Sequence, residues 1–145
     1  MKKLLLTMVL VLAMAIPAFA QHGPVKIKPL MAYATNDDYL PTPIFYLNVD
    51  QNVIFARHWE IKGSGLLTEK VEVRNSAGVL IYKFRSGPFS VDYPAFEYQH
   101  ADTYLSIGTS IPKAAGYYTV KSIYRDVATG NTWSQQIRIH VVEPV

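Results

Sequence analysis

The chain has 145 residues, of which 50% are hydrophobic and 17% are charged, and it contains no cysteine. This length is enough for one domain with a sizeable core but short for two, and the lack of cysteine excludes both disulfides and a lipoprotein anchor. The formal charge is +3, and the basic residues form no block along the chain, because most of them alternate with apolar residues. Examples are Lys70, Arg74, Lys83, Lys121 and Arg138. This pattern argues against a nucleic-acid-binding surface.

The first twenty residues have the pattern of a cleavable signal peptide. Lys2 and Lys3 precede an apolar run over residues 4–16 in which Thr7 is the single polar residue. Pro17 ends the run, and Ala18-Phe19-Ala20 supplies small residues for a signal peptidase. The apolar run is shorter than the roughly 20 residues that span a bilayer core, which favours cleavage over a retained membrane anchor. We therefore expect cleavage before Gln21.

Cleavage at that position predicts one domain over residues 21–145, located in the bacterial periplasm or outside the cell. Two of the fourteen basic residues and none of the eleven acidic residues are removed, so the formal charge falls from +3 to +1. Without disulfides, the stability of this domain must come from buried apolar area and backbone pairing.

The first half of the domain predicts strands at 25–32, 44–49, 52–62 and 67–74. In the third of these, Val53, Phe55 and Trp59 recur at even spacing, which is typical of a strand with one buried face. The glycines of Lys62-Gly63-Ser64-Gly65 are expected to end that strand. Asn75-Ser76-Ala77-Gly78 has the composition of a turn, and it predicts a hairpin between 67–74 and 79–84.

The second half predicts a weaker strand at 89–93 and clearer strands at 104–109, 117–125 and 132–142. In the last, Trp133, Gln135, Ile137, Ile139 and Val141 share one face, and polar residues occupy the other. The connector 127–131 contains Gly and Asn, which tolerate positive φ, so the final two strands are expected to form a hairpin.

No window shows the spacing of an amphipathic helix, and proline and glycine interrupt the chain often. Seven or eight short strands with turns between them predict an all-β fold. The arrangement that closes such a set without long exposed edges is an antiparallel sandwich of two sheets.

The segment 111–120, which contains Gly116-Tyr117-Tyr118, resembles the entry to the penultimate strand of immunoglobulin-like domains. The resemblance implies that Tyr118 is the corner tyrosine, whose hydroxyl bonds back to the preceding loop, and that Trp59 is the core tryptophan. It also implies a bacterial immunoglobulin-like or fibronectin type III-like module. Unlike antibody domains, this chain has no cysteine pair between its sheets, and such a likeness of fold does not carry function with it.

The sequence contains no motif for catalysis, a metal or a cofactor. The four histidines stand far apart, and His58 and His140 fall on the polar registers of their strands, so we expect them to face solvent. His22 would lie next to a free amino terminus after cleavage, but the usual copper motif needs histidine at the first or third position. Calcium could use a loop with Asn36, Asp37 and Asp38, although an ordinary solvated loop is the simpler interpretation.

Aromatic residues make up 12% of the chain, and several gather in the segment 87–104, which is expected to be a long irregular connection. Tyrosine offers a stacking face with a polar tip, which suits sugar rings or a protein partner. The alternative is that these side chains fill the core of a disulfide-free domain. The candidate binding residues are Phe89, Tyr93, Phe96, Tyr98, His100 and Tyr104.

Three hypotheses for function follow. The first is a non-catalytic module of the cell envelope that binds a surface glycan or a protein partner. This hypothesis includes no binding of nucleic acid and no membrane span after cleavage. The second is a small exported hydrolase or metal-binding protein with a site at Asp92, Glu97, His100 and Asp102. The third is a structural subunit that pairs a strand edge with a partner. We expect the first.

Overall fold

The computed structural model describes residues 23–36, 41–42, 44–47, 53–107 and 114–145. The predicted signal peptide, His22 and the Asp37-Asp38 pair lie outside the described residues. Within them, no helix has the length and hydropathy needed to cross a membrane.

The described part of the chain is all β, with seven strands. Their bounds are β1 Lys26–Thr35, β2 Ile44–Tyr46, β3 Ile54–Asn75, β4 Leu80–Tyr93, β5 Gln99–Ser106, β6 Gly116–Asp126 and β7 Thr132–Val142. The strands join in the order β1-β3-β6-β7-β2, and both β4 and β5 also pair with β3. All pairs are antiparallel except β2 with β7, so the sheet is mixed.

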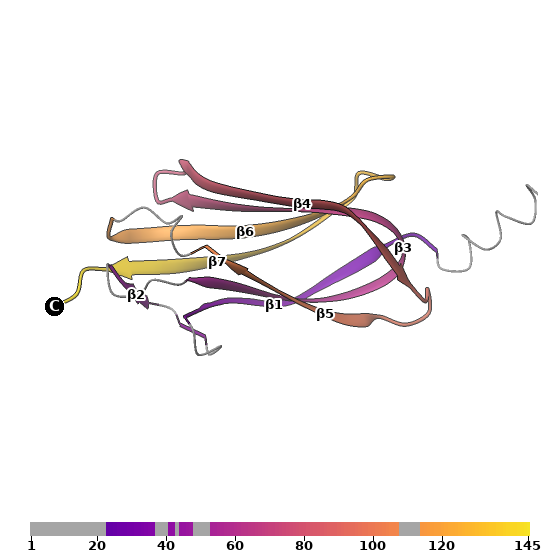
Figure 1. Ribbon diagram of the computed structural model, residues 1–145, viewed down its shortest axis with the longest axis horizontal. Coiled ribbons are helices and arrows are strands. Elements are labelled where there is room, and N and C mark those ends of the chain that lie inside the picture. The colour runs from indigo at the N-terminus through magenta and orange to yellow at the C-terminus, as the bar shows by residue number, and fades with distance from the viewer. Residues whose placement is uncertain (1–22, 37–40, 43, 48–52, 108–113) are drawn as a thin grey trace, which may run out of the picture.

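Strand β3 is 22 residues long and belongs to both halves of the sheet. Its first part, residues 54–62, lies between β1 and β5, whereas its second part, residues 67–75, lies between β4 and β6. Figure 1 shows β3 curving from the half that contains β1 and β5 to the half that contains β4, β6 and β7. The observed fold is therefore a curled mixed sheet in which β3 belongs to both halves, and the predicted antiparallel sandwich of two sheets is not confirmed.

The expected strand end at Lys62-Gly63-Ser64-Gly65 is wrong, because β3 continues through it. Gly63 has φ +87°, and a Cβ atom added there would lie 2.1 Å from the carbonyl oxygen of Pro24. Glycine thus allows a backbone conformation and a close approach that other residues would disfavour. At this position it redirects the strand instead of ending it.

The expected irregular connection over 87–104 is also wrong. Strand β4 extends to Tyr93, and β5 begins at Gln99, so most of this segment is paired with β3. The predicted hairpins are confirmed: Asn75 accepts a backbone hydrogen bond from Gly78, and Asp126 accepts one from Gly130 in the turn between β6 and β7.

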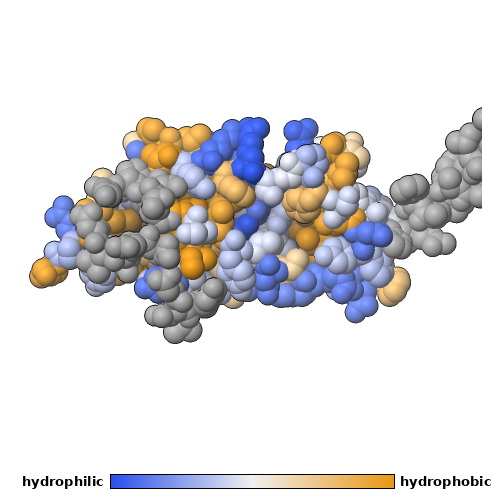
Figure 2. Space-filling view, in the orientation of Figure 1, coloured by the Kyte–Doolittle hydropathy of each residue, from blue (hydrophilic) through white to orange (hydrophobic). Residues whose placement is uncertain are grey.

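Apolar side chains from both halves meet inside the curl, where they form two buried clusters. Phe55, from the first part of β3, shares one cluster with Val71 and Val73 from the second part of the same strand. The other cluster contains Trp59 and Tyr124, whose rings meet edge to face with centroids 4.7 Å apart. Hydrophobic residues also reach the surface beside strongly hydrophilic ones on the face shown in Figure 2.

A polar layer separates the two clusters. The inward residue between Phe55 and Trp59 is Arg57, and the inward residue between Leu67 and Val71 is Glu69. Arg57 donates from Nη2 to Glu69 Oε1 at 2.6 Å and from Nε to Oε2 at 3.1 Å. These side chains are only 3% and 5% exposed, so a bidentate ion pair joins the two parts of β3 inside the molecule.

Candidate functional site

The outer face of the half formed by β4, β3, β6 and β7 is strongly basic. Residues on a strand alternate between faces, so the neighbours of the inward Val71 and Ser122 point outward. Seven basic residues and one carboxylate take such outward positions on these strands. They are Lys70 and Arg74 of β3, Lys83 and Arg85 of β4, Lys121 and Arg125 of β6, Arg138 of β7, and the carboxylate Glu72 of β3.

Glu72 supplies one negative charge against the seven positive ones, and its carboxylate already pairs with two of these basic residues. Its carboxylate oxygens lie 3.3 Å from Lys70 Nζ and 3.3 Å from Arg74 Nη2. Burial raises the pKa of Glu72, but the hydrogen bonds and charges of these partners outweigh that effect and lower it below the usual value. Within the described part of the chain, no carboxylate pairs with Lys83, Arg85, Lys121 or Arg125.

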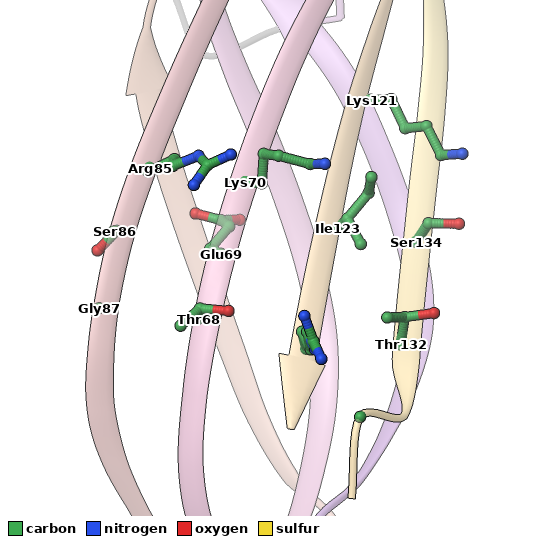
Figure 3. Close-up of a pocket in the computed structure, with 12 residues that line it drawn as sticks. Thr68, Glu69, Lys70, Arg85, Ser86, Gly87, Lys121, Ile123, Thr132 and Ser134 are labelled. Atoms are coloured by element: carbon green, nitrogen blue, oxygen red, sulfur yellow. The ribbon is translucent and has the colours of Figure 1, made fainter. Parts of the chain in front are cut away.

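A shallow cleft of about 690 Å³ crosses this basic face. Figure 3 shows Lys70, Arg85 and Lys121 around it, on three different strands. Arg125 adds a fourth cation. Hydroxyl groups come from Thr68, Thr132 and Ser134, whereas the Ser86 hydroxyl points away from the cations in Figure 3. A second hollow of about 330 Å³ shares Lys121 and continues along the same face toward Arg74 and Gln136.

Glu69 is the one carboxylate among the residues that line the larger cleft, and its side chain is buried and already bound. It accepts two bonds from Arg57 and a third from Ser122 Oγ at 2.7 Å. The cleft therefore offers cations and hydroxyl groups, but no pair of free carboxylates for acid and base catalysis.

The predicted aromatic residues fall into different environments. Phe89 and Tyr93 pack against the cluster around Trp59, whereas Phe96 is 85% exposed. Tyr98 lies beneath Lys62, whose Nζ is 4.5 Å from its ring centroid. Tyr104 is exposed and meets His58 edge to face.

His100 and Asp102, from the predicted segment, meet His58 of β3. Asp102 Oδ1 lies 2.5 Å from His58 Nδ1 and 2.7 Å from His100 Nε2. The other two carboxylates of the second hypothesis, Asp92 and Glu97, lie outside this group. Against expectation, His58 does not face solvent freely, because its side chain is only 16% exposed and stacks on Tyr33.

The two residues singled out by the resemblance occupy structural positions. Tyr118 is buried, and its hydroxyl donates to the carbonyl oxygen of Ala114 at 2.7 Å. Trp59 is fully buried within its cluster. Neither side chain is available to a ligand.

No protein-family model matches the chain, and no curated protein matches it. A solved structure does match. The C-terminal domain of wzt aligns with a TM-score of 0.56 and 12% identity, over 82% of this chain and 75% of that one. At this identity the likeness is one of fold alone, and it shows a β-rich domain architecture.

Two further structures align less well. A putative beta-galactosidase from Bacteroides fragilis has a TM-score of 0.44 and 10% identity, over 73% of this chain and 15% of that one. A beta-glucuronidase from glycoside hydrolase family 2 has a TM-score of 0.45 and 11% identity, over 74% of this chain and 11% of that one.

Sequence reasoning missed the basic face, although the signal for it was present. The alternation of basic with apolar residues along the chain predicts a dispersed charge. On the paired strands β3, β4, β6 and β7 the same alternation places the seven basic residues named above on one side, because side chains of antiparallel partners directly opposite each other point the same way.

Proposed function

We propose that this chain is an exported, non-catalytic binding module with an immunoglobulin-like fold, and that its basic cleft binds an acidic polysaccharide of the cell envelope. The observation that carries the proposal is the cluster of Lys70, Arg85, Lys121 and Arg125 around one cleft. Three of them have no carboxylate partner in the part of the chain that the structure describes. Like charges held together without counterions repel one another, so an anionic ligand would relieve an existing cost.

The composition of the cleft favours a glycan over a nucleic acid. Three hydroxyl groups, those of Thr68, Thr132 and Ser134, stand on the outer face with the cations and can hydrogen-bond to sugar hydroxyls, while the cations pair with carboxylates. The residues that line the cleft include no aromatic side chain on which a base could stack. Tyr117, an aromatic residue of the same outer face, is already covered by Arg138, whose guanidinium carbon lies 3.9 Å from its ring centroid.

A non-catalytic role is supported by the state of Glu69. It is the single acidic residue of the lining, and its oxygens already accept hydrogen bonds from Arg57 and Ser122. Glycoside hydrolysis in most families needs two carboxyl groups on either side of the scissile bond. The cleft is thus better suited to holding a chain than to cutting it.

The test is binding of polygalacturonate, a carboxylated polysaccharide, measured by isothermal titration calorimetry at low salt. The variant Arg85→Glu/Lys121→Glu reverses two cations of the cleft. We expect it to weaken binding by at least about tenfold, equivalent to about 1.4 kcal/mol. The affinity of the unmodified protein should also fall as salt is raised.

The matched control is Lys26→Glu/Lys28→Glu, which reverses two exposed lysines of β1 in the other half of the sheet. It makes the same change in net charge and should leave most of the affinity. Equal losses in both double variants would refute a specific cleft. Tighter binding of duplex DNA or of phosphatidylglycerol vesicles than of polygalacturonate would refute the glycan assignment.

A further inference from the structure

A second candidate site lies in the other half of the molecule, where β3 and β5 pair. His58 and Asp102 stand directly opposite each other in the register, and His100 is two residues from Asp102 on the same strand. Alternation therefore places all three side chains on one face. The group is brought together by strand pairing, since His58 is more than forty residues away from the other two in sequence.

The donor atoms of these residues are close enough to share one ion. One ligand atom from each residue lies within 4.8 Å of the others. Bonds of about 2.0–2.1 Å to a tetrahedral Zn²⁺ place neighbouring ligand atoms about 3.3 Å apart. The present contacts of 2.5 Å and 2.7 Å to Asp102 Oδ1 would need to open by less than 1 Å, which rotation of the exposed His100 and Asp102 side chains allows.

The protein holds His58 in place. Its ring stacks on Tyr33 with centroids 5.5 Å apart and meets Tyr104 edge to face at 6.3 Å. Its carbonyl oxygen accepts a hydrogen bond from Gln135 Nε2 at 2.7 Å, which ties the backbone to β7. The His58 Nε2 atom is buried and has no partner, so only Nδ1, which faces Asp102, is available to an ion.

The other two ligands are accessible. The side chain of His100 is 56% exposed and that of Asp102 is 36% exposed, so an ion could enter from solvent and keep a water molecule at a fourth position. One fixed ligand and two mobile ones make a site that is only partly preorganised.

We propose that His58, His100 and Asp102 form a site for a divalent transition metal ion such as Zn²⁺. Two imidazole nitrogens and one carboxylate oxygen suit Zn²⁺, Ni²⁺ or Cu²⁺, whereas Ca²⁺ and Mg²⁺ prefer oxygen ligands only. The site is independent of the basic cleft, since it uses a different pair of strands and none of the residues that line the cleft.

The simpler account of the same contacts is that Asp102 accepts hydrogen bonds from two histidines and no ion binds. The two accounts differ in what zinc does to the protein. A metal site would bind Zn²⁺ in preference to Ca²⁺ and raise the thermal midpoint of unfolding, because an ion that binds only the folded state stabilises it. A hydrogen-bonded cluster would respond to neither ion.

The experiment is calorimetric titration of the untagged protein with ZnCl₂, accompanied by thermal unfolding with and without zinc. We expect one ion per chain and an affinity that falls by at least about tenfold in His100→Ala. The change is on an exposed side chain, and circular dichroism checks that the fold is retained. Asp102→Asn, which retains the shape of the side chain, should weaken binding in the same direction.

The matched control is His140→Ala, which removes a histidine that stacks on Tyr117 on the outer face of the other half. It should bind zinc as the unmodified protein does. The proposal is overturned if the unmodified protein gives no heat and no thermal shift with zinc. It is also overturned if His100→Ala and His140→Ala lose affinity equally, which would indicate adventitious binding to surface histidines only. Variants of Arg85 and Lys121 should retain zinc, so the two proposals fail separately.

Discussion

The charged residues on the inner face of β3 and β6 are paired, whereas some of those on the outer face have no carboxylate partner among the described residues. The two sets are nevertheless neighbours in sequence. On the inside, Glu69 is held by Arg57 and Ser122, and its charge is matched by an arginine with which it shares two hydrogen bonds. On the outside, Lys121 has no carboxylate partner among the described residues. Water solvates an unmatched charge at the surface at little cost, whereas a buried charge needs a partner.

This difference distinguishes the charges that stabilise the fold from the charges that a ligand can reach. Breaking the inner pair should cost much stability, while removing an outer charge should cost little stability and much affinity. The following predictions compare inward with outward residues on these strands.

The largest effect is expected for Glu69→Gln. The substitution preserves shape but leaves the Arg57 guanidinium buried without a matching charge, which typically costs about 3–5 kcal/mol. Glu72→Gln changes the same chemical group on the outer face and should cost about 1 kcal/mol or less. Urea denaturation of both variants measures the contrast, and similar losses would show that the two faces do not differ in this way.

The double variant Arg57→Met/Glu69→Leu sharpens the result. It removes both charges at once, so no uncompensated charge remains and most of the stability lost in Glu69→Gln should return. If the double variant is as unstable as the single one, the cost lies in packing and not in the buried charge.

The next effect concerns Tyr124 at alkaline pH. Burial, with a smaller contribution from the Glu69 charge, raises the pKa of Tyr124 to about 12, while tyrosine in an unfolded chain titrates near 10. The unfolded state therefore loses its proton first. The contribution to stability is fully present below about pH 10 and is lost as pH rises through about 12, a decline of about 2–3 kcal/mol.

Urea midpoints measured between pH 9 and pH 12 test this. Tyr124→Phe should flatten the alkaline decline, and the outward Tyr117→Phe should leave it unchanged. An identical decline in Tyr124→Phe and in the unmodified protein would assign it to other groups.

The smallest effect is expected for Tyr118→Phe. The hydroxyl that bonds to the Ala114 carbonyl oxygen is lost, which should lower stability by about 0.5–1.5 kcal/mol. Tyr117→Phe, one residue earlier on the outer face, should change stability by less than about 0.5 kcal/mol. An unchanged denaturation midpoint for Tyr118→Phe would argue against a structural role of this hydrogen bond.

The sequence predicted local features well, because they depend on residues close together in the chain. The strand over residues 132–142 has the predicted bounds, and both hairpins form at the predicted turns. Alternation and turn chemistry act over a few residues, so they can be read without knowledge of the fold.

Two local signals were misleading because a distant contact decided the outcome. The glycine at position 63 favours a strand end, yet Gly63 pairs with Tyr93 of β4 and Pro24 packs against it, so the strand continues. Gly87 and Pro88 are typical of a loop, yet β4 passes through them at a register shift, and Ser86 and Phe89 on either side pair with β3.

The sequence by itself thus determined the all-β character of this protein, its turns and the alternating faces of its strands, since these follow from periodicity and backbone preference. The tertiary structure decided which charges meet. It paired Arg57 with Glu69 inside, gathered seven basic residues on one outer face, and brought His58 to His100 and Asp102. Strand order and register determine these contacts, and both depend on the packing of the whole chain rather than on any single segment.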